Sequence, residues 1–362
     1  MRLAYIYQEG TNIKKANIYQ SYSMVKAFGQ RIKVDWYRGY SKMKWDHPQS
    51  NVNQIRVINP GLQKFEKWSR LIFCFNVCIL LHLRPPTSIF TRDFAFIYFY
   101  SKIPQWARVK APIIFESHKI YSEVSDKVTP IQESKAYSVV HNFVAVSEGI
   151  KEDLQHYFDV EENRIAVLPN GIDTYPLDAM KQRNPGEINY VYAGSYGTWK
   201  GVDVIVAAAK ILQSFPVHHA LKIHIYIIGV SSNDLNTHRL DNITVIPSLD
   251  KKDLYKFYAK MDVGLVPTLN RMEGTKYTSP IKLFEYAYAG LEILASDIPS
   301  IRELESKGLH INFFNVGDPQ SLAEQMATLP TKKEDAIKNN QNLVHNYTWQ
   351  NRADQIFTAL QA

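Results

Sequence analysis

The sequence predicts an α/β fold made of two doubly wound, Rossmann-like domains, each a parallel sheet covered by helices on both faces. Strand-like runs alternate with helical patterns along most of the 362 residues, and that alternation favours parallel sheets. Residues 171–188 form a polar stretch with two prolines, two glycines and no clear periodicity, which is typical of a domain boundary. The chain therefore divides near its middle.

The first domain is expected over residues 1–172, from the runs RLAYIY, RIKVDWY, NQIRVIN, TSIFT, APIIFES, NFVAVS and RIAVLP. The second is expected over residues 187–345, from INYVYAGS, KIHIYIIG, NITVIPS, DVGLVPT, LEILASD and LHINFFN. Residues 346–362 carry apolar side chains at helical spacing and predict a helix that packs back toward the first domain. Because ligands bind at the carboxyl ends of parallel strands, we expect the two domains to face each other across a cleft.

The composition, with 45% hydrophobic and 21% charged residues, is that of a globular protein. The first ten residues, MRLAYIYQEG, predict a strand and a turn rather than a secretory signal. The apolar run Leu71–Leu83 is too short to span a bilayer. Cys74 and Cys78 fit a disulfide or metal site, but two buried thiols in a reducing compartment are the simpler interpretation. We expect a cytoplasmic protein, free or at the inner face of the membrane.

The net charge of +7 is unevenly distributed along the chain. Residues 1–119 contain 19 Lys and Arg against 6 Asp and Glu, a net charge of +13, and the remainder carries −6. A basic domain favours an anionic partner such as membrane lipid, nucleic acid or a phosphorylated acceptor, and a solvated surface without a partner is the alternative. Residues 65–84 mix apolar side chains with Lys67, Arg70 and Arg84. They fit a helix at a membrane interface or a core helix, and we favour the core helix.

The stretch YTSPIKLFEYAYAG, residues 277–290, predicts a helix with a carboxylate on its apolar side. Ser279 suits the N-cap, Pro280 the first helical position and Gly290 the end. Glu285 then borders the buried face, where a carboxylate can accept two hydrogen bonds from a ribose diol. The free N–H groups at the start of such a helix favour a phosphate. The alternative is a surface ion pair between Glu285 and Lys282.

A glycine-rich loop joins a strand to a helix in YVYAGSYGTWKGVDVIVAAAK, residues 190–210. Gly194, Gly197 and Gly201 would let backbone N–H groups approach an anion, and Lys200 stands just before the helix. The loop is neither a Walker A motif nor G-x-G-x-x-G. A purely structural turn is an equal alternative.

These two segments, together with FVAVSEGIKEDL, RIAVLPNGID and LEILASDIPSIREL, resemble glycosyltransferase family 4. The resemblance covers most of the chain and is strongest from Ile113 to Glu303. It implies the GT-B fold and a retaining, nucleotide-sugar-dependent glycosyltransferase of hexosyltransferase type, with no metal or other cofactor.

The resemblance also implies roles for individual residues. His118, Lys200 and Glu285 are the implied catalytic residues: His118 near the donor sugar and phosphate, Lys200 on the diphosphate and Glu285 on the ribose. The implied donor-binding positions are Gly10, Gly194, Ser195, Gly197, Lys200, Ile246, Ser279, Pro280, Ile281, Lys282 and Glu285. Tyr277 and Thr278 are further candidate contacts of the sugar.

The sequence departs from the family pattern at three places. Tyr277 stands eight residues before Glu285, where the family often has a sugar-contacting Glu. Ser195 stands where the family often has an Arg, and Lys282 is a candidate replacement for that cation. After the first strand, a single Gly10 stands in place of the family's Gly-Gly pair.

The residues themselves support His118 in part. It follows the strand run APIIFES, and a neutral imidazole can donate to or accept from a sugar hydroxyl. A structural histidine is the alternative. Glu116 and His118 also suggest a metal pair, but no third ligand is evident in the sequence.

We expect the chain to move a sugar from a nucleoside diphosphate donor to a glycan or lipid-linked acceptor in cell-surface polysaccharide or glycoconjugate synthesis. The expected partners are that donor, that acceptor and the anionic membrane surface, without nucleic acid. Two alternatives stay open. One is a GT-B nucleotide-sugar epimerase, and the other is a non-catalytic protein that binds anions or nucleic acid.

Overall fold

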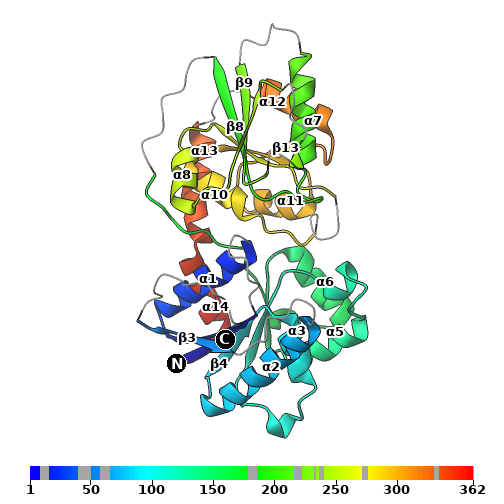
Figure 1. The fold of residues 1–362 in the computed structure, drawn as a ribbon, viewed down its shortest axis with the longest axis vertical. Coiled ribbons are helices and arrows are strands. Elements are labelled where there is room, and N and C mark those ends of the chain that lie inside the picture. Colours follow the sequence, from blue (N-terminus) through cyan, green and yellow to red (C-terminus); the bar gives the residue numbers. More distant parts are fainter. Residues whose placement is uncertain are drawn as a thin grey trace. The chain divides into compact units, whose positions relative to one another are not determined.

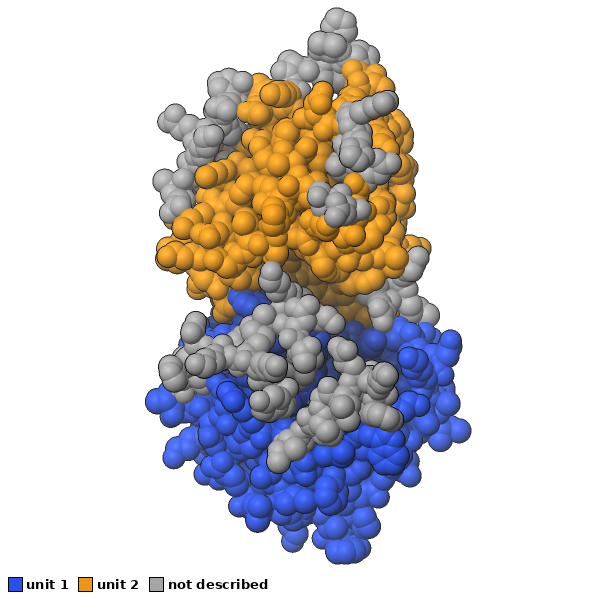
Figure 2. Space-filling view, in the orientation of Figure 1, with its two compact units in different colours: residues 1–171, 349–362 blue, residues 172–348 orange. Residues whose placement is uncertain are grey.

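The computed structural model describes residues 1–8, 16–39, 50–57, 66–177, 186–215, 222–231, 234–235, 240–270, 276–329 and 334–361. The chain forms two compact units (Figures 1 and 2). Unit 1 holds Met1–Gly171 and Trp349–Ala362, and unit 2 holds Ile172–Thr348. Each unit is a parallel sheet with its own helices, so the predicted pair of doubly wound α/β domains is confirmed.

Unit 1 is built on a seven-stranded sheet in the order β3-β2-β1-β4-β5-β6-β7. Its strands are β1 (Arg2–Tyr7), β2 (Lys33–Gly39), β3 (Val52–Val57), β4 (Ser88–Thr91), β5 (Ile113–Ser117), β6 (Asn142–Ala145) and β7 (Ile165–Val167). Its helices are α1 (Ala16–Gly29), α2 (Glu66–Leu83), α3 (Phe94–Ser101), α4 (Tyr121–Val124), α5 (Pro130–Tyr137), α6 (Glu148–Phe158) and α14 (Trp349–Gln361), with short 3₁₀ turns η2 (Gln105–Ala107) and η3 (Glu162–Arg164).

Unit 2 is built on a six-stranded sheet in the order β10-β9-β8-β11-β12-β13. Its strands are β8 (Glu187–Ala193), β9 (Lys222–Ile228), β10 (Ile243–Ile246), β11 (Val263–Val266), β12 (Glu292–Ser296) and β13 (Asn312–Phe314). Its helices are α7 (Val202–Gln213), α8 (Lys251–Tyr258), α10 (Ile281–Ala289), α11 (Pro299–Ser306), α12 (Pro319–Thr328) and α13 (Glu334–Val344), with the 3₁₀ turn η5 (His345–Tyr347).

The central strands of both sheets are buried along nearly their whole length. Every residue of β4, β5 and β11 is buried, as are four consecutive residues at the centre of β1 and at the end of β8. Helices cover both faces of a doubly wound parallel sheet, so these strands contain no polar alternation. The strand order reverses between β1 and β4 in unit 1, and between β8 and β11 in unit 2. Ligands of such sheets bind beside these points, at the carboxyl ends of the strands.

Helix α14 joins unit 1 although it follows all of unit 2 in the sequence. It packs against α1, where the rings of Phe28 and Phe357 meet edge to face with centroids 5.2 Å apart. At the exposed margin of this contact, Arg31 Nη2 lies 2.9 Å from Asp354 Oδ2. The exposed ion pair adds little stability, and the contact between the two rings accounts for more of the packing energy.

Two glycines let the helices of unit 2 approach the sheet closely. Gly201 caps α7 with φ +68°, and a Cβ there would lie 1.7 Å from the carbonyl oxygen of Pro267. Gly264 lies under the ring of Tyr286, and a Cβ there would lie 2.2 Å from that ring. Packing alone therefore requires glycine at position 201, the third glycine of the predicted anion-binding loop, whether or not the loop binds an anion.

The helix predicted from residue 280 begins one residue later. Pro280 is the N-cap of α10, with extended backbone angles, and Ile281 is the first helical residue. The prediction of Ser279 as the N-cap is therefore wrong, because the ring of Pro280 fits the extended cap position. Gly290 ends α10 in the left-handed conformation, as expected.

Candidate active site

The loop after β8 folds Lys200 back over its own first residues. Lys200 Nζ donates a hydrogen bond to Ser195 Oγ at 2.5 Å, and a Cβ added to Gly197 would lie 3.5 Å from Lys200 Cδ. The Gly194 N–H donates to the Ile228 carbonyl at 2.9 Å, which ties the loop to β9. Burial lowers the pKa of Lys200. All four donor positions predicted in this loop thus lie together at the carboxyl end of β8.

Lys282, on the first turn of α10, approaches the same loop. Its Nζ lies 4.0 Å from the centre of the Tyr192 ring, and a Cβ added to Gly194 would come 3.3 Å from that nitrogen. Burial, and after it the positive charge of Lys200, lower the pKa of Lys282 to about 7. Two amino groups that repel each other favour an anion as their common ligand, because it would relieve the repulsion.

The carboxylate of Glu285 is buried on α10 and meets a lysine from another helix. Its Oε1 is in contact with Lys251 Nζ from α8, and the Tyr258 hydroxyl donates to Oε2 at 3.4 Å. The alternative of an ion pair with Lys282 is wrong, because Lys282 turns toward Tyr192 instead. The burial of this carboxylate is thus balanced by Lys251, a residue that the sequence analysis did not single out.

Five predicted contacts precede or begin α10. Tyr277 is buried, whereas the other four are half-buried; the five are Tyr277, Thr278, Ser279, Pro280 and Ile281. The first backbone N–H groups of α10 therefore follow directly after partly accessible residues, in the same short segment as Lys282.

Another predicted position, Ile246, lies apart from the Lys200 loop. Ile246 is the last residue of β10, and its carbonyl accepts a hydrogen bond from the Gly229 N–H at 2.9 Å. It lies at the carboxyl edge of the sheet, with β9 between its strand and β8. Gly10 lies outside the described residues.

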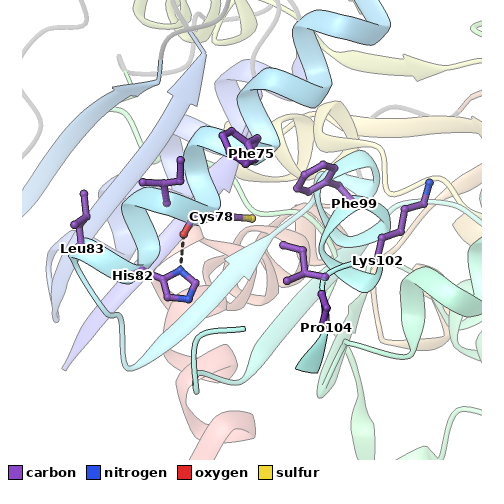
Figure 3. Close-up of a pocket in the computed structure, with 9 residues that line it drawn as sticks. Phe75, Cys78, His82, Leu83, Phe99, Lys102 and Pro104 are labelled. Carbon is purple, nitrogen blue, oxygen red and sulfur yellow. Dashed lines mark hydrogen bonds between the residues drawn. The ribbon is translucent and has the colours of Figure 1, made fainter. Parts of the chain in front are cut away.

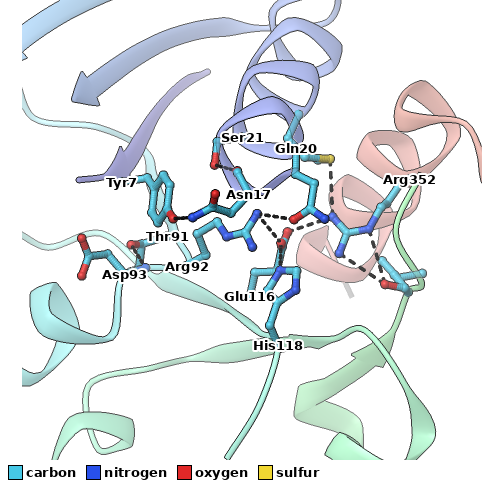
Figure 4. Close-up of polar contacts among 12 residues, drawn as sticks. Tyr7, Asn17, Gln20, Ser21, Thr91, Arg92, Asp93, Glu116, His118 and Arg352 are labelled. Carbon is cyan, nitrogen blue, oxygen red and sulfur yellow. Dashed lines mark hydrogen bonds and ion pairs between the residues drawn. The ribbon is translucent and has the colours of Figure 1, made fainter. Parts of the chain in front are cut away.

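In unit 1, a charged network surrounds Glu116 at the end of β5 (Figure 4). Arg352 Nη1 lies 2.8 Å from Glu116 Oε2, Arg92 Nη1 lies 3.8 Å from Oε1, and His118 Nε2 is in contact with Oε1. Burial by itself would raise the pKa of Glu116, but the charge of Arg352, followed by the other partners, holds it well below its usual range. Glu116 is therefore an ionised centre that binds three side chains.

Arg352 is held from several sides. Its Nε donates to the Pro169 carbonyl at 2.8 Å and its Nη2 to the Leu168 carbonyl at 3.2 Å, while the whole side chain is buried. These carbonyl contacts fix the guanidinium in the plane in which it meets Glu116. Helix α14 thereby contributes directly to the strand end that His118 follows.

Arg92 approaches from the carboxyl end of β4. Its Nη1 donates to Gln20 Oε1 on α1 at 2.9 Å, and its guanidinium lies 5.3 Å from the centre of the Tyr7 ring (Figure 4). Tyr7 ends β1, so Arg92 lies next to the point where the strand order reverses. Two guanidinium groups near Glu116 oppose a metal ion at the Glu116–His118 pair, which was an alternative interpretation.

His118 is partly buried and neutral at ordinary pH. Burial, and next the charge of Arg92, lower the pKa of His118 to about 4 against the opposing influence of Glu116. Since a carboxylate only accepts, the neutral ring donates from Nε2 to Glu116 and keeps Nδ1 as an acceptor. This tautomer can take a hydrogen bond from a sugar hydroxyl at Nδ1.

The sequence analysis missed Arg92, Arg352 and Lys251. Arg352 carried a signal, because it interrupts a helix whose neighbours Trp349, Ala353 and Ile356 are apolar. Arg92 directly follows a buried strand run, at a position where parallel sheets bind ligands. Nothing in the sequence around Lys251, which lies among other charged residues, distinguishes it from a surface lysine.

Two family models match the chain, one in each half. The model described as "Glycosyltransferase Family 4" matches residues 21–175, and the model described as "Glycosyl transferases group 1" matches residues 187–332. Models of glycosyltransferases of the family 4 and group 1 kind therefore match both halves of the chain. The resemblance seen in the sequence is thus confirmed, and the group 1 match contains the Lys200 loop and α10.

A curated protein that matches this chain is a distant relative. A D-inositol 3-phosphate glycosyltransferase from Corynebacterium efficiens is 23% identical over 283 residues, which span 68% of this chain and 65% of that protein. The match thus covers less than two thirds of that relative's length.

Solved structures establish the GT-B fold of this chain. Sucrose-phosphate synthase from Thermosynechococcus elongatus superposes with a TM-score of 0.76 at 14% identity, over 99% of this chain and 98% of that one. HepE from Anabaena in complex with UDP-glucose has a TM-score of 0.71 at 14% identity, over 100% and 99% of the two chains.

Proposed function

We propose that the chain is a retaining glycosyltransferase that moves a hexose from a nucleoside diphosphate sugar to a hydroxyl of a glycan or lipid-linked acceptor. The observation that carries this proposal is the pair of neighbouring amino groups, Lys200 and Lys282, at the carboxyl end of β8 beside the start of α10. The two family-model matches support glycosyl transfer, and the HepE complex with UDP-glucose supports a nucleotide-sugar donor.

The difficult step is breaking the bond between the sugar and the diphosphate. The sugar gains cationic character while negative charge develops on the leaving phosphate. Lys200, Lys282 and the first N–H groups of α10 would stabilise that charge, which is the largest contribution that such a site can make. Lys282 then supplies the positive charge that an Arg at position 195 would provide in the family pattern.

The nucleotide would be oriented by Glu285. A ribose diol donates to carboxylate oxygens, and Glu285 already shares its charge with Lys251. Lys251 holds the carboxylate in place, so the ribose would bind to an acceptor that is already oriented before the nucleotide arrives.

The sugar would be positioned by His118, whose free Nδ1 accepts a hydrogen bond from a hydroxyl. In the proposed reaction, the acceptor attacks the face from which the diphosphate departs, so the anomeric configuration is retained without a covalent enzyme intermediate or a metal. The basic residues 1–119 favour an anionic or lipid-linked acceptor in cell-surface polysaccharide or glycoconjugate synthesis at the inner face of a membrane.

The test starts with thermal unfolding in the presence of UDP, GDP, ADP and their sugars. A specific donor binds the native state and raises the unfolding temperature by mass action. The stabilising donor is then incubated with and without acceptor hydroxyl compounds, and NMR of the product reports the anomeric configuration. If the donor alone is converted to an isomer, the protein is an epimerase rather than a transferase. If no nucleoside diphosphate stabilises the protein, the proposal is wrong.

A further inference from the structure

Helix α2 exposes a continuous row of large apolar side chains. One face packs into unit 1 through Phe73, Val77 and Leu81, which are fully buried. The opposite face is open to solvent, and Trp68 is 65%, Phe75 56% and Leu83 72% exposed. The exposed row consists of Trp68, Leu71, Ile72, Phe75, Ile79 and Leu83. The core-helix interpretation of residues 65–84 is therefore correct for one face only.

The row continues into an apolar groove between α2 and α3 (Figure 3). The groove has a volume of about 560 Å³. Its apolar lining includes Phe75, Ile79, Leu83, Phe99, Ile103 and Pro104. Trp106, two residues beyond Pro104 in η2, is 88% exposed. Exposed apolar surface of this extent marks an interaction site.

The same region is strongly basic. Residues 66–112 contain seven Lys and Arg against two acidic residues, Glu66 and Asp93. Asp93 is buried and caps α3, whereas Lys67, Lys102 and Lys110 are exposed. Within residues 67–112, an anionic surface that approaches α2 would therefore meet exposed cations and apolar side chains, since the one carboxylate of that range, Asp93, is buried.

We infer that the outer face of α2, the α2–α3 groove and Trp106 dock onto an anionic lipid bilayer. The row would enter the boundary between headgroups and acyl chains, the groove would receive the apolar part of a lipid, and the lysines would lie among the phosphates. Trp68 and Trp106 suit the interfacial level of a membrane. This inference rests on the proposed function, because the bilayer is where the enzyme would meet a lipid-linked acceptor.

Other occupants fit the surface less well. A second copy of this chain would place the same basic patch against itself across a two-fold axis, and like charges would oppose each other. The cores of protein interfaces are depleted in Lys, whereas lysines around apolar side chains are typical of anionic membrane surfaces. Helix α2 cannot cross the bilayer while its other face packs on the sheet. Nor does any helix in the described part of the chain have the length and hydropathy of a membrane span.

The test is flotation of the full chain with vesicles in the absence of donor and acceptor. We expect binding to vesicles of phosphatidylcholine mixed with phosphatidylglycerol, weaker binding to phosphatidylcholine alone, and loss of binding at high salt. The triple variant F75S/I79S/L83S should lower the partition coefficient by more than about tenfold. The triple variant K67Q/K102Q/K110Q should lower it about fivefold for each lysine.

Two controls distinguish the loss of the membrane-binding surface from a loss of folding. The variant I131S/Y157S removes two exposed apolar side chains of α5 and α6 and should bind vesicles like the wild type. Each variant should also keep the stabilisation by the nucleoside diphosphate that the wild type shows. Because flotation requires no donor, it can succeed or fail independently of the proposed transferase activity.

A tryptophan reporter tests the groove itself. In the background W68F/W106F, the substitution Phe99→Trp places an indole in the groove, and we expect vesicles containing brominated acyl chains to quench its emission. Equal vesicle binding by wild type and F75S/I79S/L83S would overturn the inference. A wild-type dimer that this variant dissociates, without vesicle binding by either, would overturn it in favour of a second copy.

Discussion

Arg352 on α14 reaches Glu116 at the end of β5, with its Nη1 2.8 Å from Glu116 Oε2 and both side chains 2% exposed. The pair spans 236 residues of sequence and joins two segments of unit 1 that unit 2 separates in the chain. Because His118 is in contact with the other oxygen of Glu116, the guanidinium helps to fix the position of the imidazole.

Replacing Arg352 by Met should lower the free energy of unfolding. Removing one partner of a buried ion pair typically costs about 3–5 kcal/mol, and we expect the lower end because Arg92 remains near Glu116. Urea unfolding measures the loss. Arg302→Met is the matched control: Arg302 pairs with Asp297 and Glu305 at the surface, and its loss should cost about 1 kcal/mol or less. Equal losses in the two variants would show that the buried Arg352–Glu116 pair contributes no more stability than a surface ion pair.

The pKa of His118 predicts a fall in stability with acid. The imidazole titrates at about 4 in the folded state against 6.5 in the unfolded chain, so the unfolded state binds more protons between these values. Stability from this residue is therefore present above pH 6.5 and is lost as the pH falls toward 4. Across that pH range, the free energy of unfolding should change less steeply with pH in His118→Gln than in the wild type. The exposed His310→Gln should keep the wild-type slope, and an identical slope in His118→Gln would contradict the lowered pKa.

Lys282 should couple donor binding to protonation. Its pKa is about 7 in the free protein, and a bound diphosphate would favour the protonated form and raise it. Nucleoside diphosphate affinity should therefore weaken as the pH rises above about 7, with uptake of a proton on binding. Calorimetry in buffers of different ionisation enthalpy measures that uptake. Lys282→Met should remove the part due to this lysine, while Lys256→Met on α8 should retain it.

Lys200→Ala should reduce kcat/KM with the correct donor. Loss of a hydrogen bond to a charged group costs about 1.5–3 kcal/mol, which corresponds to roughly 10–150-fold. The exposed Lys252→Ala serves as the control. A near-normal kcat/KM in Lys200→Ala would remove this residue from the diphosphate site.

Glu285→Gln should weaken nucleotide binding by about tenfold, because a neutral amide accepts less strongly from a ribose diol than a carboxylate does. The substitution also leaves Lys251 without its buried anion. We therefore expect the double variant E285Q/K251M to unfold at a higher urea concentration than E285Q while keeping the weakened affinity. If calorimetry shows that E285Q binds the nucleotide as tightly as the wild type, Glu285 does not bind the ribose.

The strands were predictable because their runs are rich in apolar and β-branched residues. Each of the thirteen predicted runs overlaps an observed strand, and the Gly290 end of α10 follows from its backbone conformation. The partners of the buried charges were not predictable. Lys251 meets Glu285 from another helix, 34 residues away, and Arg352 meets Glu116 across 236 residues. Local spacing instead suggested Lys282 for Glu285, since helical neighbours are the only partners that sequence periodicity reveals.

The position of Arg352 also has a consequence for biosynthesis. A ribosome makes residue 352 only after all of unit 2 has been translated. Unit 2 is one continuous segment and can complete its core during translation, as domains generally do. The nascent unit 1, although made first, holds Glu116 without its nearest cation until residues 349–361 emerge. The N-terminal half of the sequence is thus the half that finishes folding last.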